Sequence, residues 1–499
     1  MSRIVRNAFL VMAGTLSSRL LGQVRQSILT NLPLPDTLKD AFWVAYRIPN
    51  LLRELLAEGA IQNALIPVLT SLPAEEAQVF ARRFGAFLLG VNLVILGLGL
   101  VFAPQIASAL LWLSELSLAQ SPLRDPAVFE QLVLMIRLVM PFLLFISMAS
   151  LFSSMLQSGE RFGLTSFSPI AFNVGSIVLM LLFPGSVVAL GLSVALGGAL
   201  QALVQLPALK GYGLEFRWHP AFNQALARIG PFAFTTSVRQ FLNLVLLSIL
   251  AAYPSAAVTG FQNGELIFTT ALGLLAVSPA MAAFPRLSAL AGNGDLPAAR
   301  ELLRRIVARL AVPLAFAAAM MVALAPWVVG TLYAITPNFS EANRAFTTQT
   351  VMALGLALLP WGLNQLLLRG FYAVGQVGQA VRVTVMMALL NTFGYWLLRE
   401  QGLFVLNLAT AIAGWLGLVI YARRLQAFQM ASLAEVGLVV GKALLAAVPA
   451  GWVAYTVAMQ FGIPAFFLQN LLPLVAGGLA GLTVFAGLAY VLRLPLKLR

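Results

Sequence analysis

Apolar runs of about 20 residues recur along the whole chain, separated by short stretches that hold Pro, Gly or charged residues. Such a run is long enough to cross a hydrocarbon core of about 30 Å as an α-helix. The runs are centred near residues 17, 55, 97, 142, 174, 200, 240, 272, 317, 360, 388, 412, 446 and 480. The pattern predicts an all-α polytopic membrane protein with about 14 transmembrane helices.

The composition supports a membrane protein and excludes several classes of enzyme. Of the 499 residues, 60% are hydrophobic and only 10% are charged, which is too little polar surface to cover a water-soluble globule. Cys is absent, so disulfides, Cys-ligated zinc and a catalytic thiol are excluded. The chain has no phosphate-binding G-x-x-x-x-G-K-[ST] loop and no paired-acid motif, so we expect no enzyme and no cofactor.

The basic residues predict the orientation of the chain. The formal net charge is +14, from 31 Lys and Arg against 17 Asp and Glu. We place 21 of the basic residues in loops on the side of the two termini and only four opposite, namely Lys39, Arg124, Arg344 and Arg399. Because basic loops stay in the cytoplasm, we expect both termini there and no role in nucleic-acid binding.

Two halves of the chain share landmarks, which predicts an internal duplication. Pro67 and Pro285 are 218 residues apart, and Pro141 and Pro360 are 219 residues apart. Units with an even number of crossings repeat in parallel, as in many transporters. The expected parts are a six-helix lobe at 1–212, a second six-helix lobe at 213–428, and a hairpin of two helices at 429–499.

Six arginines lie within the predicted spans or near their ends: Arg19, Arg25, Arg47, Arg53, Arg137 and Arg239. One Arg at the centre of a membrane helix costs about 2.5–3.5 kcal/mol on an insertion scale. The four in the first two spans would therefore cost roughly 10–14 kcal/mol if they faced lipid. They are expected to face water or polar partners.

Acidic residues accompany these arginines in the second span. Asp40, Arg47 and Glu54 recur every seven residues, and Glu58 follows one turn later. In one interpretation the acids and arginines only pair with one another, and the first-span arginines reach an interface. In the other, four arginines against three acids leave a positive excess for a phosphate or diphosphate.

Other polar positions give weaker indications. Arg239 and Glu265 either pair with each other or contact a substrate. Four residues could bind a cation but more commonly form interhelical hydrogen bonds: Asn243, Asn391, Asn407 and Thr410. Residues 443–492 carry no charge, so these two helices either line a groove for a lipid tail or form a lipid-facing hairpin.

Several segments resemble the MurJ (MviN) family of lipid II flippases, within the multidrug/oligosaccharidyl-lipid/polysaccharide exporter superfamily. They are SRLLGQVRQ (18–26), DAFWVAYRIPNLLRELLAEGAIQNALIPVL (40–69) and PFLLFISMASLFSSMLQSGERF (141–162). The resemblance implies two six-helix lobes around a cationic cavity and a groove for the undecaprenyl tail on helices 13 and 14. It also implies alternating access in the bacterial inner membrane, moving lipid II from the cytoplasmic to the periplasmic leaflet.

The resemblance also assigns residues. The essential arginines of the family fall on Arg19, Arg25 and Arg53, and its acidic positions fall on Asp40 and Glu58. Where the family often has Asp-Arg in helix 8, this chain has Asn-Gly at 263–264, followed by Glu265. Arg239 is a hypothetical replacement for the missing charge.

The resemblance leaves the energy source open. Some members bind sodium through acids in helices 7 and 11, where this chain has the neutral Gln240, Asn243 and Asn391, so sodium coupling is disfavoured. Moving two negative charges outward across 100 mV, interior negative, gains roughly 4.6 kcal/mol, so the membrane potential is the expected driving force. The expected partners are lipid II and membrane lipids, and the sequence indicates no protein partner. The alternatives are a flippase for another polyprenyl-diphosphate glycan, a multidrug exporter, or a scaffold or lipid-sugar enzyme.

Overall fold

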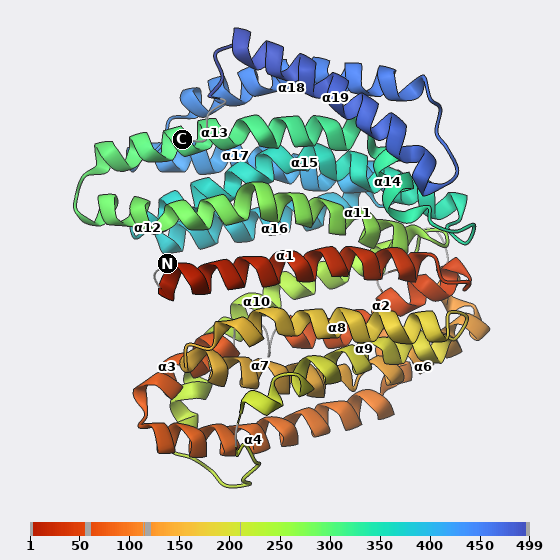
Figure 1. Ribbon diagram of the computed structural model, residues 1–499, viewed down its shortest axis with the longest axis vertical. Helices are drawn as coiled ribbons and strands as arrows, with labels where there is room; N and C mark the ends of the chain where they lie inside the picture. The colour runs from red at the N-terminus through yellow and green to blue at the C-terminus, as the bar shows by residue number, and fades with distance from the viewer. Residues whose placement is uncertain (1–2, 55–60, 113, 115–120, 210, 496–499) are drawn as a thin grey trace. The chain divides into compact units, whose positions relative to one another are not determined.

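The structure is a computed structural model that describes residues 3–54, 61–112, 114, 121–209 and 211–495. The side chains at 3–9, 62–63, 228–239 and 241 fall outside this description. Within the described residues the chain forms 19 α-helices and no strands, which confirms the predicted fold class (Figure 1). It divides into two compact units, residues 1–258 and 259–499.

The first unit contains ten helices. They are α1 (Arg3–Thr30), α2 (Asp36–Leu52), α3 (Gln62–Ser71), α4 (Ala74–Val101), α5 (Ala103–Trp112), α6 (Pro126–Val139), α7 (Phe142–Ser158), α8 (Phe162–Leu182), α9 (Val187–Leu203) and α10 (Phe222–Leu250). Pro184 lies in the turn between α8 and α9, and Pro141 separates α6 from α7. The proline ring removes a backbone donor and ends or kinks a helix, so these boundaries follow from the sequence.

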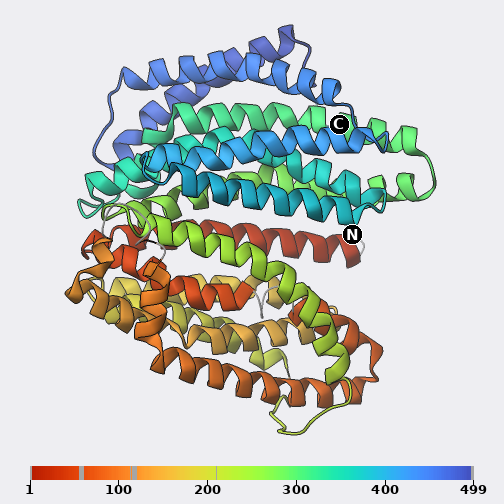
Figure 2. The ribbon, with the colours of Figure 1, turned by 180° about the vertical axis from the view of Figure 1, so that it is seen from behind.

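The second unit contains nine helices. They are α11 (Ala257–Leu272), α12 (Ser278–Gly292), α13 (Leu296–Ala323), α14 (Ala325–Tyr333), α15 (Glu341–Ala373), α16 (Val377–Leu398), α17 (Leu403–Gln426), α18 (Leu433–Met459) and α19 (Phe467–Val491). A single π-helical turn, Gly273–Val277, joins α11 to α12. The reverse view in Figure 2 shows α16 and α17 side by side.

Eleven stretches in the described residues are helical, long and apolar enough to cross a membrane. They account for eleven of the fourteen predicted spans. The other three correspond to α1, to α2 with α3, and to α10, and they hold five of the six arginines singled out by the sequence; Arg137 lies on α6. Charge lowers the hydropathy of these helices, so their place in the membrane depends on polar surroundings within the protein.

The helix order of the first unit recurs in the second. The series α4–α5–α6/α7–α8–α9 matches α13–α14–α15–α16–α17 in length and sequence of elements. The short helices α5 and α14 both begin with Ala-Pro, at residues 103–104 and 325–326. Equivalent pairs pack together, because α7 contacts α9 as α15 contacts α17, and α8 contacts α9 as α16 contacts α17. These similarities support the predicted duplication, while the boundaries at 212 and 428 stay a prediction.

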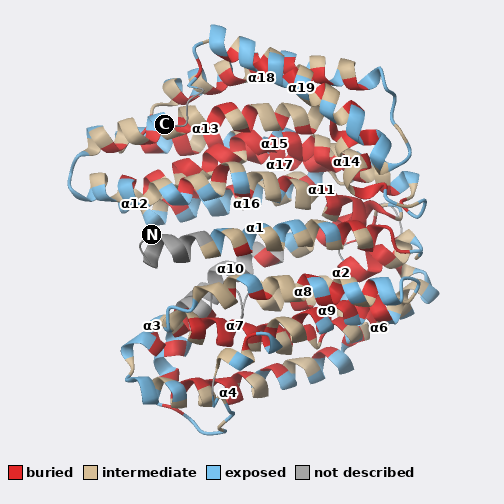
Figure 3. Ribbon diagram, viewed as in Figure 1, coloured by how far each residue is buried: buried red, intermediate tan, exposed pale blue. Residues whose placement is uncertain are grey.

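The interior of the second unit is centred on α15, whose apolar stretch is mostly buried (Figure 3). In contrast, α16 and α19 expose many large apolar side chains, as lipid-facing helices do. Two glycines let α19 approach α18 closely: a Cβ at Gly477 would lie 2.6 Å from the Ala454 carbonyl oxygen, and one at Gly481 would lie 3.0 Å from that of Ala450. The C-terminal pair of helices is therefore tightly packed through small residues.

Candidate functional site

Close packing between α1 and α8 in the first unit positions the arginines of α1. A Cβ at Gly14 would lie 2.4 Å from the backbone oxygen of Ser166, so only glycine permits this approach. One turn further along α1, the Asn173 side chain of α8 donates a hydrogen bond of 3.2 Å to the Ser18 carbonyl. This contact fixes α1 on α8 just before Arg25.

Arg25 lies half-buried with an aromatic ring beneath its guanidinium. The guanidinium carbon is 5.0 Å from the centre of the Phe172 ring of α8, a cation–π distance. Its Nε is buried and has no hydrogen-bond partner among the described residues. Arg25 is also close enough to Arg53 for the two positive charges to repel each other. The arrangement concentrates positive charge beside a flat apolar surface, which suits a phosphate group better than a cation.

Arg53 follows α2 directly and is held by an amide. Its Nε and Nη2 both donate to Oδ1 of Asn50, at 3.1 and 2.9 Å. The neighbouring Glu54 carboxylate is 4.0 Å from Nη2, the outer limit of an ion pair. The neutral Asn50 side chain thus helps to fix the Arg53 guanidinium in position.

Gln240 of α10 joins this group from a distant part of the chain. Nη2 of Arg47 donates a hydrogen bond of 3.0 Å to Oε1 of Gln240. The Gln240 amide nitrogen donates in turn to the second carboxylate oxygen of Glu54. Gln240 is only 1% exposed, so both hydrogen bonds are shielded from water. The helices α2 and α10 are therefore connected through a polar bridge at the site.

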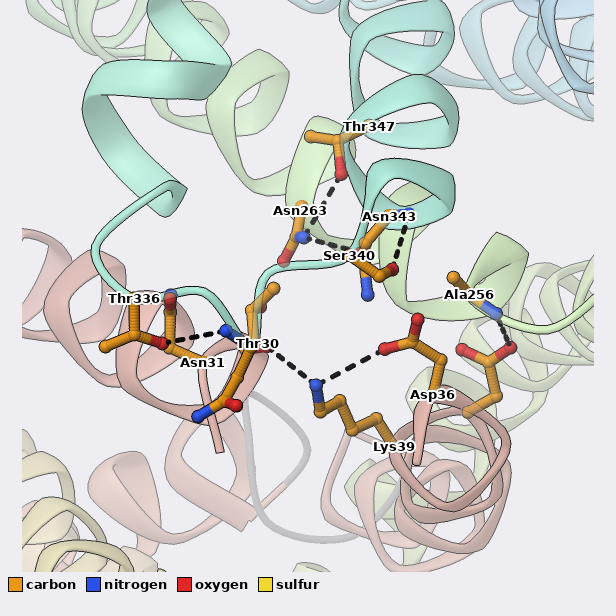
Figure 4. A network of polar contacts seen from close by, with 12 residues as sticks. Thr30, Asn31, Asp36, Lys39, Ala256, Asn263, Thr336, Ser340, Asn343 and Thr347 are labelled. Atoms are coloured by element: carbon orange, nitrogen blue, oxygen red, sulfur yellow. Dashed lines mark hydrogen bonds and ion pairs between the residues drawn. The ribbon is translucent and has the colours of Figure 1, made fainter. Parts of the chain in front are cut away.

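Asp40 and Lys39 lie in the first turns of α2 and are almost completely buried. The Asp40 carboxylate accepts a hydrogen bond of 2.8 Å from the backbone nitrogen of Ala256. The Lys39 ammonium donates to the Thr30 carbonyl at 3.0 Å and to Asp36 at 3.3 Å (Figure 4). Lys39 was expected in a loop, and its burial in α2 is a correction: backbone and carboxylate oxygens replace the water around its charge.

Four other predicted site residues take no part in the contacts given above. Arg19 is exposed on α1. Glu58 and the Arg239 side chain lie outside the described residues. Glu265 is half-buried on α11 of the second unit, where its charge interacts with Tyr395 of α16.

The positions where the family often has Asp-Arg are occupied here by a neutral, tightly packed pair. Asn263 is fully buried, and its amide donates to Oγ1 of Thr347 at 3.2 Å (Figure 4). Its backbone oxygen accepts a hydrogen bond from the Tyr333 hydroxyl at 3.0 Å. A Cβ at Gly264 would lie 2.5 Å from Cγ2 of Thr350, so an Arg side chain has no room there. Packing explains the missing charge.

An apolar cavity of about 530 Å³ lies within the second unit. It is bordered by α13, α14, α15, α17 and α18. Its walls are mostly small or aliphatic residues, with the aromatic side chains of Trp415, Trp452 and Tyr455. A space of this kind accommodates hydrocarbon rather than a charged headgroup.

The structure adds site residues that sequence reasoning missed. Neither Asn50 nor Phe172 could be singled out from the sequence, because amides and phenyl rings are common in membrane helices. Gln240 was considered only as a poor sodium ligand. In the structure its amide oxygen accepts a hydrogen bond from the Arg47 cation. Gln240 and Glu54 are 186 residues apart in the sequence, so no local pattern could indicate their contact.

A repeated order of membrane-crossing helices and a basic polar site inside them define a multi-pass membrane transporter. A sequence profile of the family described as lipid II flippase MurJ matches residues 35–473. The chain belongs to this family.

Similar proteins cover most of the chain. A probable lipid II flippase MurJ of Vibrio cholerae is 28% identical, with 100% of this chain and 97% of that protein covered. One of Rickettsia prowazekii is 22% identical, with 98% of each covered. A lipid II flippase MurJ of Burkholderia cenocepacia is 28% identical over 76% of this chain and 75% of its own length.

Solved structures support the fold. A lipid II flippase MurJ in an inward closed conformation matches with a TM-score of 0.79 at 18% identity, covering 97% of this chain and 100% of the other. An inward-facing multidrug resistance transporter of the MATE family, in the MOP superfamily, matches with a TM-score of 0.64 at 13% identity, over 82% and 95% of the chains. The fold is therefore shared by exporters of different cargo, and the site must decide what this chain carries.

Proposed function

We propose that this protein moves lipid II from the cytoplasmic to the periplasmic leaflet of the bacterial inner membrane by alternating access. The observation that carries the proposal is the grouping of Arg25 and Arg53 inside the first unit. The Asn50 amide accepts a hydrogen bond from Arg53, and Arg25 lies over the Phe172 ring. Guanidinium groups bind phosphate oxygens through paired, charge-assisted hydrogen bonds, so two neighbouring arginines suit a diphosphate.

The lipid tail is proposed to bind at a different site from the headgroup. The cavity in the second unit is bordered by α18, the first helix of the C-terminal pair, and is almost entirely apolar. Part of a polyprenyl chain could bind in this apolar cavity, while the charged headgroup binds at the polar site of the first unit. A larger residue at Ala447 would fill the cavity, so Ala447→Trp should weaken binding of long-chain diphosphates more than of short-chain ones.

Native mass spectrometry of the purified protein tests the headgroup site. Lipid II, undecaprenyl phosphate and a cationic dye are offered to the wild type and to Arg19→Ala, Arg25→Ala and Arg53→Ala. Arg382→Ala, which removes an exposed arginine from α16, is the matched control. We expect preferential lipid II binding that is lost in Arg25→Ala and Arg53→Ala and kept in the control. Binding that ignores these arginines, or prefers the dye, contradicts the proposal.

The membrane potential is the proposed driving force, with both termini in the cytoplasm. Two negative charges that move outward gain roughly 4.6 kcal/mol at 100 mV. Flipping should therefore slow when an ionophore collapses the potential. An unchanged rate would refute the membrane potential as the driving force, and it would not contradict the proposed headgroup site.

A further inference from the structure

We propose that Leu214, Phe216 and Trp218, in the segment that connects α9 to α10, insert into the membrane interface and bind anionic phospholipid there. These three residues are called the interface anchor below. The anchor is separate from the arginine site, so the inference does not depend on the proposed function. It assigns a partner, the lipid surface, to a part of the chain outside the apolar helices.

The side chains of the interface anchor are large, apolar and exposed. Leu214 is 43% exposed, Phe216 is 75% exposed and Trp218 is 57% exposed. They occupy every second position of a stretch that is neither helix nor strand, so no regular element of their own covers them. Because leaving apolar area in water costs free energy, such a group suits a hydrocarbon surface.

The residues between the anchor side chains and before them are bound to the protein. The Tyr212 ring packs against Phe152 of α7, with 5.0 Å between the ring centres. Its hydroxyl occupies the space that a Cβ at Gly85 of α4 would need. The Glu215 carboxylate accepts a hydrogen bond of 2.7 Å from Arg83 of α4. The segment is therefore docked on α4 and α7 while its apolar side chains stay exposed, beside α4 in Figure 1.

The interface anchor lies at the level where α4 enters the membrane. Residues 84–101 of α4 carry no charge, and at a helical rise of about 1.5 Å per residue they extend about 27 Å, close to the thickness of the hydrocarbon core. Arg83 precedes this stretch and donates a hydrogen bond of 3.4 Å to the Trp218 carbonyl. The Trp218 ring centre is 6.1 Å from that of Phe87, one turn into the stretch. Trp218 thus lies where lipid headgroups meet hydrocarbon, the level at which Trp is enriched in membrane proteins.

Positive charge accompanies the anchor. Arg217 is exposed and lies between Phe216 and Trp218 in the sequence. Arg161 donates a hydrogen bond of 3.0 Å to the Ala208 carbonyl, and this bond does not neutralise the arginine because its acceptor is uncharged. Basic residues beside inserted apolar side chains bind anionic lipid surfaces. With the termini in the cytoplasm, as proposed above, the anchor faces the cytoplasmic leaflet, whose surface is negative.

A single spin label measures how deep the anchor lies. The chain has no Cys, so Phe216→Cys provides one attachment site for a nitroxide. The labelled protein is placed in nanodiscs of phosphatidylcholine and phosphatidylglycerol. Electron paramagnetic resonance then compares collisions with oxygen, which concentrates in the bilayer, and with a nickel chelate, which stays in water. We expect a several-fold higher ratio of oxygen to nickel collisions at position 216 than at a water-exposed control.

Asn293→Cys is the matched control. Asn293 is exposed in the turn before α13, and the apolar stretch of α13 begins only near residue 310, about 20 Å further along the helix. A label at 216 that collides with nickel as often as one at 293 would overturn the proposal. A label that collides with neither reagent would overturn it as well, because protein, either a second copy or another partner, would then cover the anchor.

The preference for anionic lipid has its own test. In nanodiscs of phosphatidylcholine alone, the ratio of oxygen to nickel collisions at 216 should fall, because the positive charges no longer draw the segment to the surface. Arg161→Gln combined with Arg217→Gln should remove the difference between the two lipid compositions. Both residues are exposed, so the protein should fold normally. A ratio that is high and equal in both compositions without these substitutions would refute anionic binding. Leu214→Cys repeats the measurements if Phe216→Cys does not fold.

Discussion

The two units share a helix order but use polar residues differently. In the first unit, α1, α2 and α10 bring arginines and an acid together with amides between them. In the second, the fully buried polar residues that the structure describes are neutral: Asn263 bonds to Thr347, and Asn407 donates to Thr350 at 3.2 Å. The same architecture thus supports a charged site in one unit and a set of interhelical hydrogen bonds in the other.

The difference indicates that the polar residues of the two units have different roles. Charges kept inside a membrane protein are costly and are retained where they act on a substrate. Neutral amides and hydroxyls that pair across helices mainly hold those helices together. We therefore expect substitutions in the first unit to change binding and those in the second to change stability.

The largest expected effect distinguishes Arg53 from Asn263. Arg53→Ala removes charge-assisted hydrogen bonds to the diphosphate and should lower lipid II affinity about 10- to 100-fold with little change in melting temperature. Asn263→Ala should instead destabilise the protein by about 1–3 kcal/mol, since its partners are left unsatisfied, while the folded fraction binds normally. Binding assays and thermal unfolding measure both. Weaker binding in Asn263→Ala but not in Arg53→Ala would contradict this assignment of binding to the first unit.

The next effect concerns the close packing of Gly264. An added methyl would lie 2.5 Å from Cγ2 of Thr350, so Gly264→Ala should cost about 1–3 kcal/mol of stability. Thr350→Ser removes that methyl and keeps the hydroxyl, and it should recover part of the melting temperature in the double variant, because Cβ of residue 350 still lies 2.7 Å from the added methyl. No rescue would show that something other than this contact excludes a side chain at 264.

A related substitution in the first unit should reach the binding site. Gly14→Ala forces α1 away from the Ser166 backbone, which cannot move aside as a side chain can. Arg25 lies further along the same helix, so we expect several-fold weaker lipid II binding in addition to lower stability. Gly90→Ala is the control, because a Cβ there meets nothing within 4 Å. Unchanged binding in Gly14→Ala would show that the packing of α1 on α8 does not position the binding site.

The smallest effect is on the segment that precedes α10. Arg83 donates a hydrogen bond of 2.7 Å to Glu215 and holds the pKa of that carboxylate below its ordinary value. A lowered pKa in the folded state means that this contribution is present above the ordinary value and is lost as pH falls through the lowered one. Relative to the intrinsic exchange rate at each pH, protection of the amides in 211–219 should therefore be similar at pH 7 and pH 5 and lower in more acidic buffer. Glu215→Gln should remove that dependence.

Most of the fold could be predicted from the sequence, because long apolar runs report membrane crossings directly. The turn at Pro184 could also be predicted, since proline acts locally, whereas Pro141 was expected in the middle of a span and instead separates α6 from α7. The burial of Lys39 was not, because a lone lysine beside a polar stretch resembles a loop. Its partners, Thr30 and Asp36, are supplied only once the turn between α1 and α2 has formed.

The site was predictable only in part. The arginines of the first two spans were found because charge in a membrane helix is expensive wherever it points. Their partners were not: Gln240 and Phe172 come from helices far along the chain, and nothing in their local sequence marks them. Sequence therefore identified the charges, and the structure identified the side chains that surround them.

Reconstitution into vesicles tests the central claim most directly. Fluorescent lipid II in proteoliposomes is exposed to a membrane-impermeant quencher, and the rate at which it crosses the bilayer is compared for the wild type, Arg53→Ala and the control Arg382→Ala. The account predicts rapid crossing with the wild type and the control and a strong reduction with Arg53→Ala. Equal crossing in all three would contradict the claim that the arginines of the first unit carry the diphosphate.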